Sequence, residues 1–200
     1  MRKVTVLAVI ALSLVAGNAM AESINGRLGL TGKAGFMVPL KDGSINGTAF
    51  ETSTGFAFGG GLIYGFCKNF AGEVDVTHAP SMNVKIGGIK VAEAQSSDIG
   101  LGIQYRIMPG NKLVPFIGIG ADFIKGDIDA STIDWTIGGH VNGGVDFFLN
   151  KSIALTADIR GVYAAKSDIT QNGVKVGKFD PTSFIGTVGI RLFLPENWSD

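Results

Sequence analysis

Thirteen ionisable side chains share one face of the strands that this sequence predicts, and they are its main candidates for chemistry. Five are Arg or Lys, seven are Asp or Glu, and one is a histidine. Buried together, such groups must pair and hydrogen-bond, because an unpaired buried charge is strongly destabilising. The set predicts either a structural ion-pair network or a polar constriction that gates a passage. Its members are Arg27, Lys33, Glu73, Asp75, Asp98, Arg106, Asp122, Asp134, His140, Asp146, Asp158, Arg160 and Arg191.

Catalysis and metal binding find little support among these residues. His140 lies near Asn142 and Asp146 in the sequence but has no matching nucleophile, so a place in a hydrogen-bonded network is favoured over a lipid-modifying active site. His78, beside Pro80, has no partner at ligand spacing, whereas a metal site needs three or four convergent ligands. We expect no catalytic residue, no metal, no cofactor and no enzymatic activity.

Glycine-rich stretches and overall charge exclude two further classes. "GGGLIYG" and "GIGADF" do not link a buried strand to a helix, as a phosphate-binding loop does. The 200-residue chain has a formal net charge of zero, which argues against nucleic acid as a partner. Cys67 is the single cysteine, so no intramolecular disulfide can form.

The elements that must position the ionisable groups alternate with a period of two. In "WTIGGHVNGGVDFF", residues 135–148, the large aliphatic residues occupy odd positions and the polar ones even positions. Such alternation is typical of a strand with one apolar face. Seven more segments share it and bring the predicted strands to eight: residues 26–38, 52–66, 70–77, 97–107, 115–123, 153–163 and 183–194.

A transmembrane barrel explains this pattern better than a soluble sandwich, which would also alternate. The polar face is dense in glycine, as the crowded inside of a narrow barrel requires, and aromatic residues gather toward strand ends, as in membrane-interface girdles. We therefore predict an all-β, eight-stranded antiparallel transmembrane β-barrel of the bacterial outer membrane. The expected lipid-facing aromatics are Phe36, Tyr64, Phe66, Phe70, Tyr105, Phe123, Trp135, Phe147, Tyr163 and Phe184.

Connection lengths support the barrel, because short and long links alternate. Tight turns at 67–69, 108–112 and 149–152 separate longer segments near 39–51, 78–97, 124–132 and 164–181, as periplasmic turns and outer loops do in such barrels. "VKIGGIKV" and "ITQNGVKV" predict projecting hairpins. Folding each about its turn pairs Val76 with Ile99 and Val74 with Leu101, and likewise Ile159 with Gly186 and Leu155 with Ile190. Residues 39–50, 77–92 and 122–133 are expected to shape the outer mouth.

The N-terminus predicts a secretory signal. Arg2 and Lys3 precede an apolar run over 4–15, and "AMA" at 19–21 forms an A-x-A cleavage site. The run is shorter than the ~20 residues of a membrane-spanning helix. We expect cleavage before Glu22, leaving residues 22–200 as a single barrel domain.

Three segments carry a family resemblance: "VPFIGIGADF", "GGHVNGGVDFFLNKSIALTADIRGV" and "FDPTSFIGTVGIRLFL". The chain resembles the OmpW family of small outer-membrane barrels, mainly over residues 112–194, with OmpA-like barrels next closest. It departs from the usual pattern at the C-terminus, where Leu194 replaces an aromatic residue and "PENWSD" follows. The resemblance implies a narrow channel or lateral conduit for small hydrophobic molecules.

Apolar residues on the polar face are the candidates for lining such a passage, with small filler in a tight lumen as the alternative. They are Met37, Ile63, Phe116, Phe148, Val162 and Ile185, with Phe193 beside them. The competing function is a structural or interaction barrel, OmpA-like or adhesin-like, that acts through its outer loops. The expected partners are outer-membrane lipid, small hydrophobic solutes, and periplasmic chaperones and the barrel-assembly machinery during biogenesis.

Overall fold

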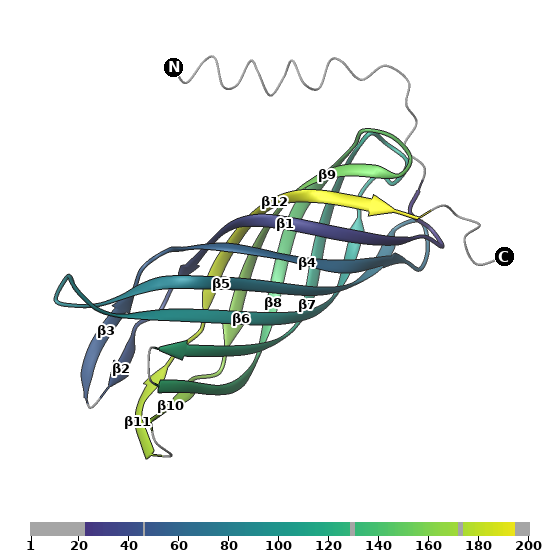
Figure 1. The fold of residues 1–200 in the computed structure, drawn as a ribbon. Coiled ribbons are helices and arrows are strands. Elements are labelled where there is room, and N and C mark those ends of the chain that lie inside the picture. The colour runs from purple at the N-terminus through teal and green to yellow at the C-terminus, as the bar shows by residue number, and fades with distance from the viewer. Residues whose placement is uncertain (1–22, 46, 129–130, 172–173, 195–200) are drawn as a thin grey trace, which may run out of the picture.

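The computed structural model describes residues 23–45, 47–128, 131–171 and 174–194, and within them twelve strands form one antiparallel sheet (Figure 1). No helix among these residues is long and apolar enough to cross a membrane. The predicted signal segment lies outside the described residues. The strands are β1 (Leu28–Pro39), β2 (Gly43–Ile45), β3 (Thr48–Thr52), β4 (Gly55–Gly65), β5 (Phe70–Ile86), β6 (Ile89–Arg106), β7 (Leu113–Ile128), β8 (Ser131–Phe148), β9 (Ile153–Ala164), β10 (Ser167–Gln171), β11 (Val174–Phe179) and β12 (Ser183–Phe193).

Eight of these strands close into a ring. Neighbours in the order β1, β4, β5, β6, β7, β8, β9, β12 are hydrogen-bonded, and β12 pairs back to β1. A closed ring satisfies backbone amides without water, which a barrel needs in lipid. The predicted all-β antiparallel barrel is therefore confirmed, although the chain forms four further short strands.

The two registers derived from the hairpins are also confirmed. Val74 pairs with Leu101 and Val76 with Ile99 across β5 and β6. Across β9 and β12, Leu155 pairs with Ile190 and Ile159 with Gly186. Gly87 and Gly88 both adopt positive φ angles, +57° and +82°, as a two-residue turn of this kind requires. The turn expected at residues 172–173 lies outside the described residues.

The predicted long loops differ most from the structure, because much of their length is strand. β5 and β6 run unbroken to the turn at residues 87–88, and β7 continues to Ile128. Residues 39–51 contain the β2–β3 hairpin, and 164–181 contain β10 and β11. Alternation persists in these segments, and most of them pair with the strand that follows in the chain, as β5 does with β6, β2 with β3 and β10 with β11.

The four short strands, β2, β3, β10 and β11, lengthen the barrel wall. β3 pairs with β5, β2 with β3, β11 with β2, β10 with β11, and β10 with β8. Together with the parts of β5, β6, β7 and β8 that extend past the eight-stranded ring, they form a second closed ring that continues the barrel. We call this end of the molecule the hairpin end, and the end that carries turns 67–69, 108–112 and 149–152 the turn end (Figure 1).

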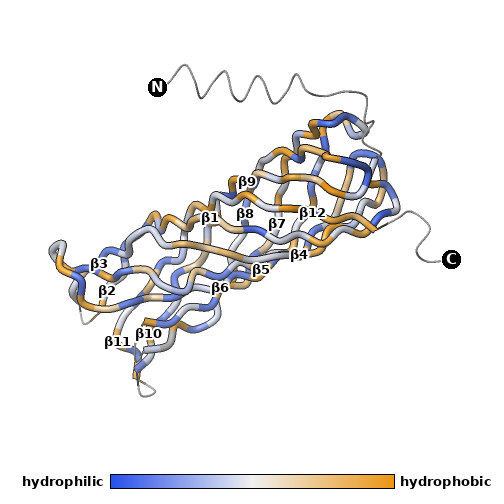
Figure 2. Tube along the Cα trace, turned by 45° about the horizontal axis from the view of Figure 1, so that its top comes forward, coloured by the Kyte–Doolittle hydropathy of each residue, from blue (hydrophilic) through white to orange (hydrophobic). Residues whose placement is uncertain are grey.

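The two faces of the wall differ sharply in chemistry, and apolar and polar residues alternate along the strands (Figure 2). Outward aliphatic side chains such as Ile119, Ile137 and Val188 are about two-thirds exposed, at 66%, 65% and 65%. Leaving such a side chain in water costs about 1.5–3 kcal/mol relative to an apolar medium. Lipid is the medium that relieves this cost. Leu194, just beyond β12, also faces outward.

Candidate functional site

A layer of charged side chains crosses the middle of the barrel interior. On β5 it occupies Glu73 and Asp75, between the fully buried Ala71 and Ala79. All the remaining strands of the first ring, with the exception of β4, also contribute to it. We call this set the charged layer: Lys33, Glu73, Asp75, Asp98, Arg106, Asp122, His140, Asp146, Asp158, Arg160 and Arg191.

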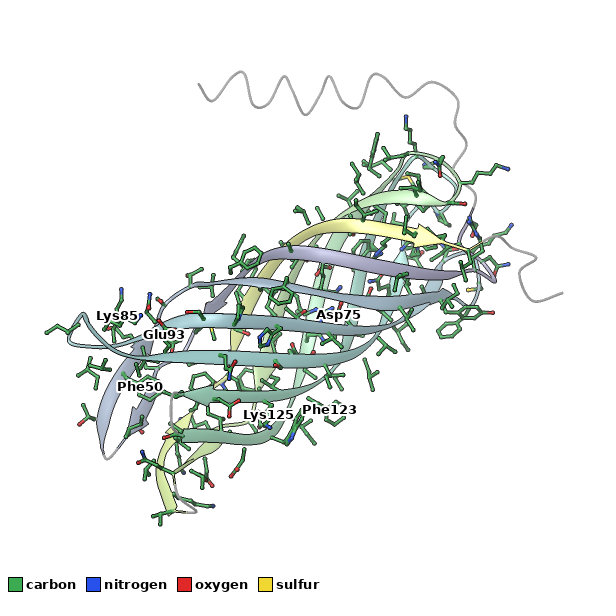
Figure 3. All side chains as sticks on the ribbon, in the orientation of Figure 1. Phe50, Asp75, Lys85, Glu93, Phe123 and Lys125 are labelled. Atoms are coloured by element: carbon green, nitrogen blue, oxygen red, sulfur yellow. The ribbon has the colours of Figure 1, made fainter. Side chains whose placement is uncertain are left out.

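Most bases of the charged layer join one continuous chain of ion pairs. Lys33 Nζ donates to Asp75 Oδ1 at 2.7 Å. Arg160 reaches both Asp75 (3.1 Å) and Glu73 (3.2 Å). Arg191 then links Glu73 (3.0 Å) to Asp146 (2.9 Å), and Arg106 completes the chain at Asp146 (2.6 Å). Figure 3 shows Asp75 on this part of the wall.

Three acids of the charged layer, Asp98, Asp122 and Asp158, have no Lys or Arg ion-pair partner among the described residues. His140 Nδ1 lies 2.7 Å from Asp122 Oδ1, and Asn142 donates to Asp158 at 2.9 Å. The imidazole fits because its neighbours are glycines: a Cβ on Gly120 would lie 2.5 Å from His140 Cε1. Asp98 is also buried here. Within the described chain, no three His, Cys, Asp or Glu residues are grouped as metal ligands.

Two of the predicted charged residues lie outside the charged layer. Arg27 is at the turn end, where it donates to the carbonyls of Lys151 (2.7 Å), Leu194 (3.0 Å) and Phe193 (3.4 Å). Among the described residues, Arg27 contacts backbone carbonyls and no carboxylate, so it caps the barrel end.

The prediction that Asp134 faces the lumen is wrong, because its side chain is exposed. The β7–β8 register passes from Ile124–Thr136 to Gly126–Ile133, so β8 contains one extra residue. A bulge of this kind shifts the alternation by one position. Asp134 and Trp135 consequently both lie on the outer surface, and the Asp134 carbonyl accepts from Ser167 Oγ at 2.6 Å.

The six apolar candidates for lining a passage are all buried, but they lie at different heights along the barrel and do not form one group. Ile63 and Phe148 belong to a small turn-end cluster, with Ile24, Ala71, Val114, Ala154 and Phe193. Phe116 lies in the charged layer, where the guanidinium carbons of Arg191 and Arg106 sit 5.1 Å and 5.9 Å from its ring centroid. Only Met37, Val162 and Ile185 reach the hairpin end.

The hairpin end contains a larger apolar interior that the sequence analysis missed. We call it the hairpin-end cluster: Met37, Phe50, Ala57, Ala79, Met82, Val84, Ala94, Ile124, Ile128, Ile133, Val162, Ala164, Ile169, Phe179 and Ile185. Phe50 of β3 and Phe179 of β11 stack across it with ring centroids 6.5 Å apart. Most of the missed members lie in segments treated as loops, where continued alternation was the available signal.

The aromatic residues predicted to face lipid all lie on the outer surface, fully or partly exposed. Several form ring contacts there, with centroid separations of 5.2 Å for Phe70–Tyr105, 5.7 Å for Tyr64–Phe66 and 6.5 Å for Phe36–Phe184. Phe147, Phe123, Trp135 and Tyr163 complete the set.

The ladder between β4 and the wall's next strand, β5, is interrupted near the hairpin end. It runs to Phe58–His78 and resumes where Ser53 N–H donates to the Asn83 carbonyl at 2.9 Å, next to the β3–β5 pair Thr52–Val84. On β5 the interruption contains Pro80, which lacks an N–H, and a register irregularity between Ala79 and Met82. We call this stretch of the wall, residues 54–57 and 79–82, the seam. Its inward side chains, Ala57, Ala79 and Met82, belong to the hairpin-end cluster.

A closed antiparallel ring with a lipid-compatible exterior and a buried ionic interior defines the class of small membrane barrels. A family model described as "Outer membrane protein beta-barrel domain" matches residues 7–199. The chain belongs to that family, and the protein is an outer-membrane barrel. A search of curated proteins gave no match.

Solved structures share the fold at low sequence identity. OprG from Pseudomonas aeruginosa is 16% identical with a TM-score of 0.69, covering 87% of this chain and 98% of its own. AlkL, solved in DMPC lipid bilayers, is 19% identical with a TM-score of 0.58, covering 90% and 94%. Neisserial surface protein A is 19% identical with a TM-score of 0.58, covering 84% and 97%. The predicted small outer-membrane β-barrel is confirmed, in family by the matching model and in fold by these structures.

Proposed function

We propose that this barrel lets small hydrophobic molecules cross the outer membrane passively, as a narrow OmpW-like conduit with a lateral exit. The observation that carries the proposal is the hairpin-end cluster, an apolar interior directly inside the seam. Short turns face the periplasm in such barrels, so the hairpin end faces outward. On this proposal the barrel is not an enzyme, and its partners are outer-membrane lipid and apolar solutes.

The composition of the interior favours entry at the hairpin end. An apolar solute meets buried Met, Phe and Ile side chains there, such as Met82, Phe50 and Ile128. Apolar surroundings favour such a solute by about 25 cal/mol for each Å² of surface removed from water.

The rest of the lumen disfavours passage straight through. The charged layer lies between the hairpin-end cluster and the turn end, and separating its ion pairs would cost free energy. At the turn end, Ile24 and Ile63 are almost completely buried and Arg27 ties the end together. A solute that dissolves in the apolar interior therefore gains nothing by continuing along the barrel axis.

The seam supports a sideways exit. With Pro80 unable to donate, the wall there has fewer backbone hydrogen bonds to break than elsewhere along β4 and β5. Its inner side is apolar and its outer side presents Phe56, which is exposed to the membrane. A hydrophobic solute that leaves at this point enters lipid without contacting the charged layer.

Two alanines of β5 provide a matched test. Ala79 and Ala71 are both 0% exposed, but Ala79 lies at the seam and Ala71 in the turn-end cluster. Ala79→Phe is expected to slow uptake of an apolar fluorescent solute into vesicles severalfold, and Ala71→Phe to leave it unchanged. Should either variant fail to fold, the Ala79→Val and Ala71→Val pair replaces it. Equal rates for both variants, or wild-type uptake no faster than in protein-free vesicles, would contradict the proposal.

A structural or interaction role through the outer hairpins is the second candidate. Exposed apolar side chains at two hairpin tips favour it: Ile89 (71%), Val91 (53%) and Val174 (64%). Binding of whole cells to host or envelope components that is lost in Ile89→Ser/Val174→Ser, with solute uptake absent from wild type, would select this role.

A further inference from the structure

The outer surface of β5, β6 and β7 changes from apolar to polar between two successive outward rows of paired residues. Val76, Ile99 and Phe123 pair across the three strands and face outward. Two residues toward the hairpin end, His78 pairs with Ser97 and Ser97 with Lys125. Paired side chains on one face of adjacent strands lie about 4.5–5.5 Å apart at Cβ. The second row therefore forms a compact polar group, which we call the boundary row.

Within the boundary row, His78 and Ser97 contact each other, and the Lys125 ammonium takes no part in this contact. His78 Nδ1 lies 2.9 Å from Ser97 Oγ, and the edge of the imidazole packs on Phe58 with centroids 5.6 Å apart. Lys125 is partly exposed and projects from the wall beside Phe123 (Figure 3). Among the described residues, no carboxylate lies within 4 Å of the Lys125 ammonium. The exposed lysines Lys90 and Lys175, by contrast, are each paired with an acid.

We propose that the boundary row binds the phosphate group of an outer-leaflet lipid, whose acyl chain lies on Val76, Ile99 and Phe123. The Lys125 ammonium supplies the charge, and the His78–Ser97 pair supplies a hydrogen-bond donor. This donor is the Ser97 hydroxyl when His78 Nδ1–H donates to Ser97, and the other ring N–H of His78 when Ser97 donates to Nδ1. A lipid fits better than a free phosphate ion, because the apolar surface continues directly from the polar group. Two carboxylates bound the site on the same outer face: Asp127, the next outward residue on β7, and Asp134, at the β8 bulge opposite Lys125. This site is separate from solute passage and does not depend on it.

Matched lipids in a bilayer test the site. The full chain is reconstituted in phosphatidylcholine nanodiscs that contain either phosphatidic acid or diacylglycerol with the same acyl chains, and retained lipid is measured by native mass spectrometry. Wild type is expected to retain phosphatidic acid and not diacylglycerol. Lys125→Gln is expected to lower phosphatidic acid retention about fivefold, the effect of one lysine near a charged membrane surface.

Controls separate this site from general charge effects. Lys125→Arg keeps the cation and is expected to keep retention, whereas Ser97→Ala with His78→Phe lowers it. Lys41→Gln removes an exposed lysine elsewhere at the hairpin end and is expected to change nothing. Equal retention of the two lipids, no effect of Lys125→Gln, or an equal effect of Lys41→Gln would overturn the proposal. Full displacement of phosphatidic acid by millimolar inorganic phosphate would overturn the part that assigns a lipid.

Discussion

Arg106 Nη2 donates to Asp146 Oδ2 at 2.6 Å, and both side chains are almost completely withdrawn from solvent. The same carboxylate oxygen accepts from Arg191 at 2.9 Å, so one acid on β8 joins β6 to β12 across the lumen. Burying one such charge without a partner is costly. The charged layer therefore links strands across the middle of the barrel interior.

Asp146→Ala is expected to destabilise the barrel by about 3–5 kcal/mol, because it strips a carboxylate from two buried guanidinium groups. Urea unfolding in phospholipid vesicles, followed by tryptophan fluorescence, measures the change. Asp168→Ala removes an acid from an outer hairpin and is expected to alter stability by less than about 0.5 kcal/mol. Similar losses in the two variants would show that the charged layer adds little to stability.

Gly120→Ala is expected to cost about 1–3 kcal/mol, because the new methyl group would overlap the His140 ring and the Leu101 carbonyl oxygen. The His140–Asp122 hydrogen bond should be disturbed with it. Gly32→Ala is the control, since a Cβ there meets nothing within 4 Å. Unfolding free energies of the two variants in vesicles give the comparison, and an equal cost would argue against a tight imidazole site.

Trp135 is expected to be quenched by brominated lipid, because it shares the outward parity of Ile137 and is 58% exposed on the outer surface. The experiment uses a Trp198→Phe background, in which Trp135 is the remaining tryptophan. Bromines near the headgroups should quench it more than bromines deep in the acyl chains, since aromatic girdles lie at the membrane interfaces. Fluorescence unaffected by either lipid would place this face of the barrel away from the bilayer.

The β10–β11 hairpin is expected to loosen in acid. A hydrogen bond from Lys175 lowers the pKa of Asp168, and the same contact raises the pKa of Lys175. The contribution of Asp168 is complete above its ordinary pKa, about 3.9, and is lost as the pH falls through the lowered value. Amide protection factors in β11 should therefore fall below about pH 4. In Asp168→Asn this pH dependence should disappear, and a hairpin that responds equally in both proteins would exclude the ion pair as its cause.

The sequence by itself determined the faces of the wall strands and the pairing across two hairpins. A period of two is a local property, so Val76 and Ile99 could be placed on the same outward face from their spacing alone. Folding about the turn at Gly87 and Gly88 gave the right β5–β6 register at Val76–Ile99, because the two register irregularities between the turn and this pair shift it in opposite directions and cancel.

Tertiary structure decided which inward groups meet and where the alternation breaks. Glu73 and Arg191 are 118 residues apart in the chain, and only closure of the ring brings them to 3.0 Å. The extra residue on β8 moved Asp134 outward, because a bulge depends on the partner strand. The apolar candidates separated into opposite ends for the same reason: spacing assigns a residue to a face, but its height along the barrel follows from strand pairing around the whole ring.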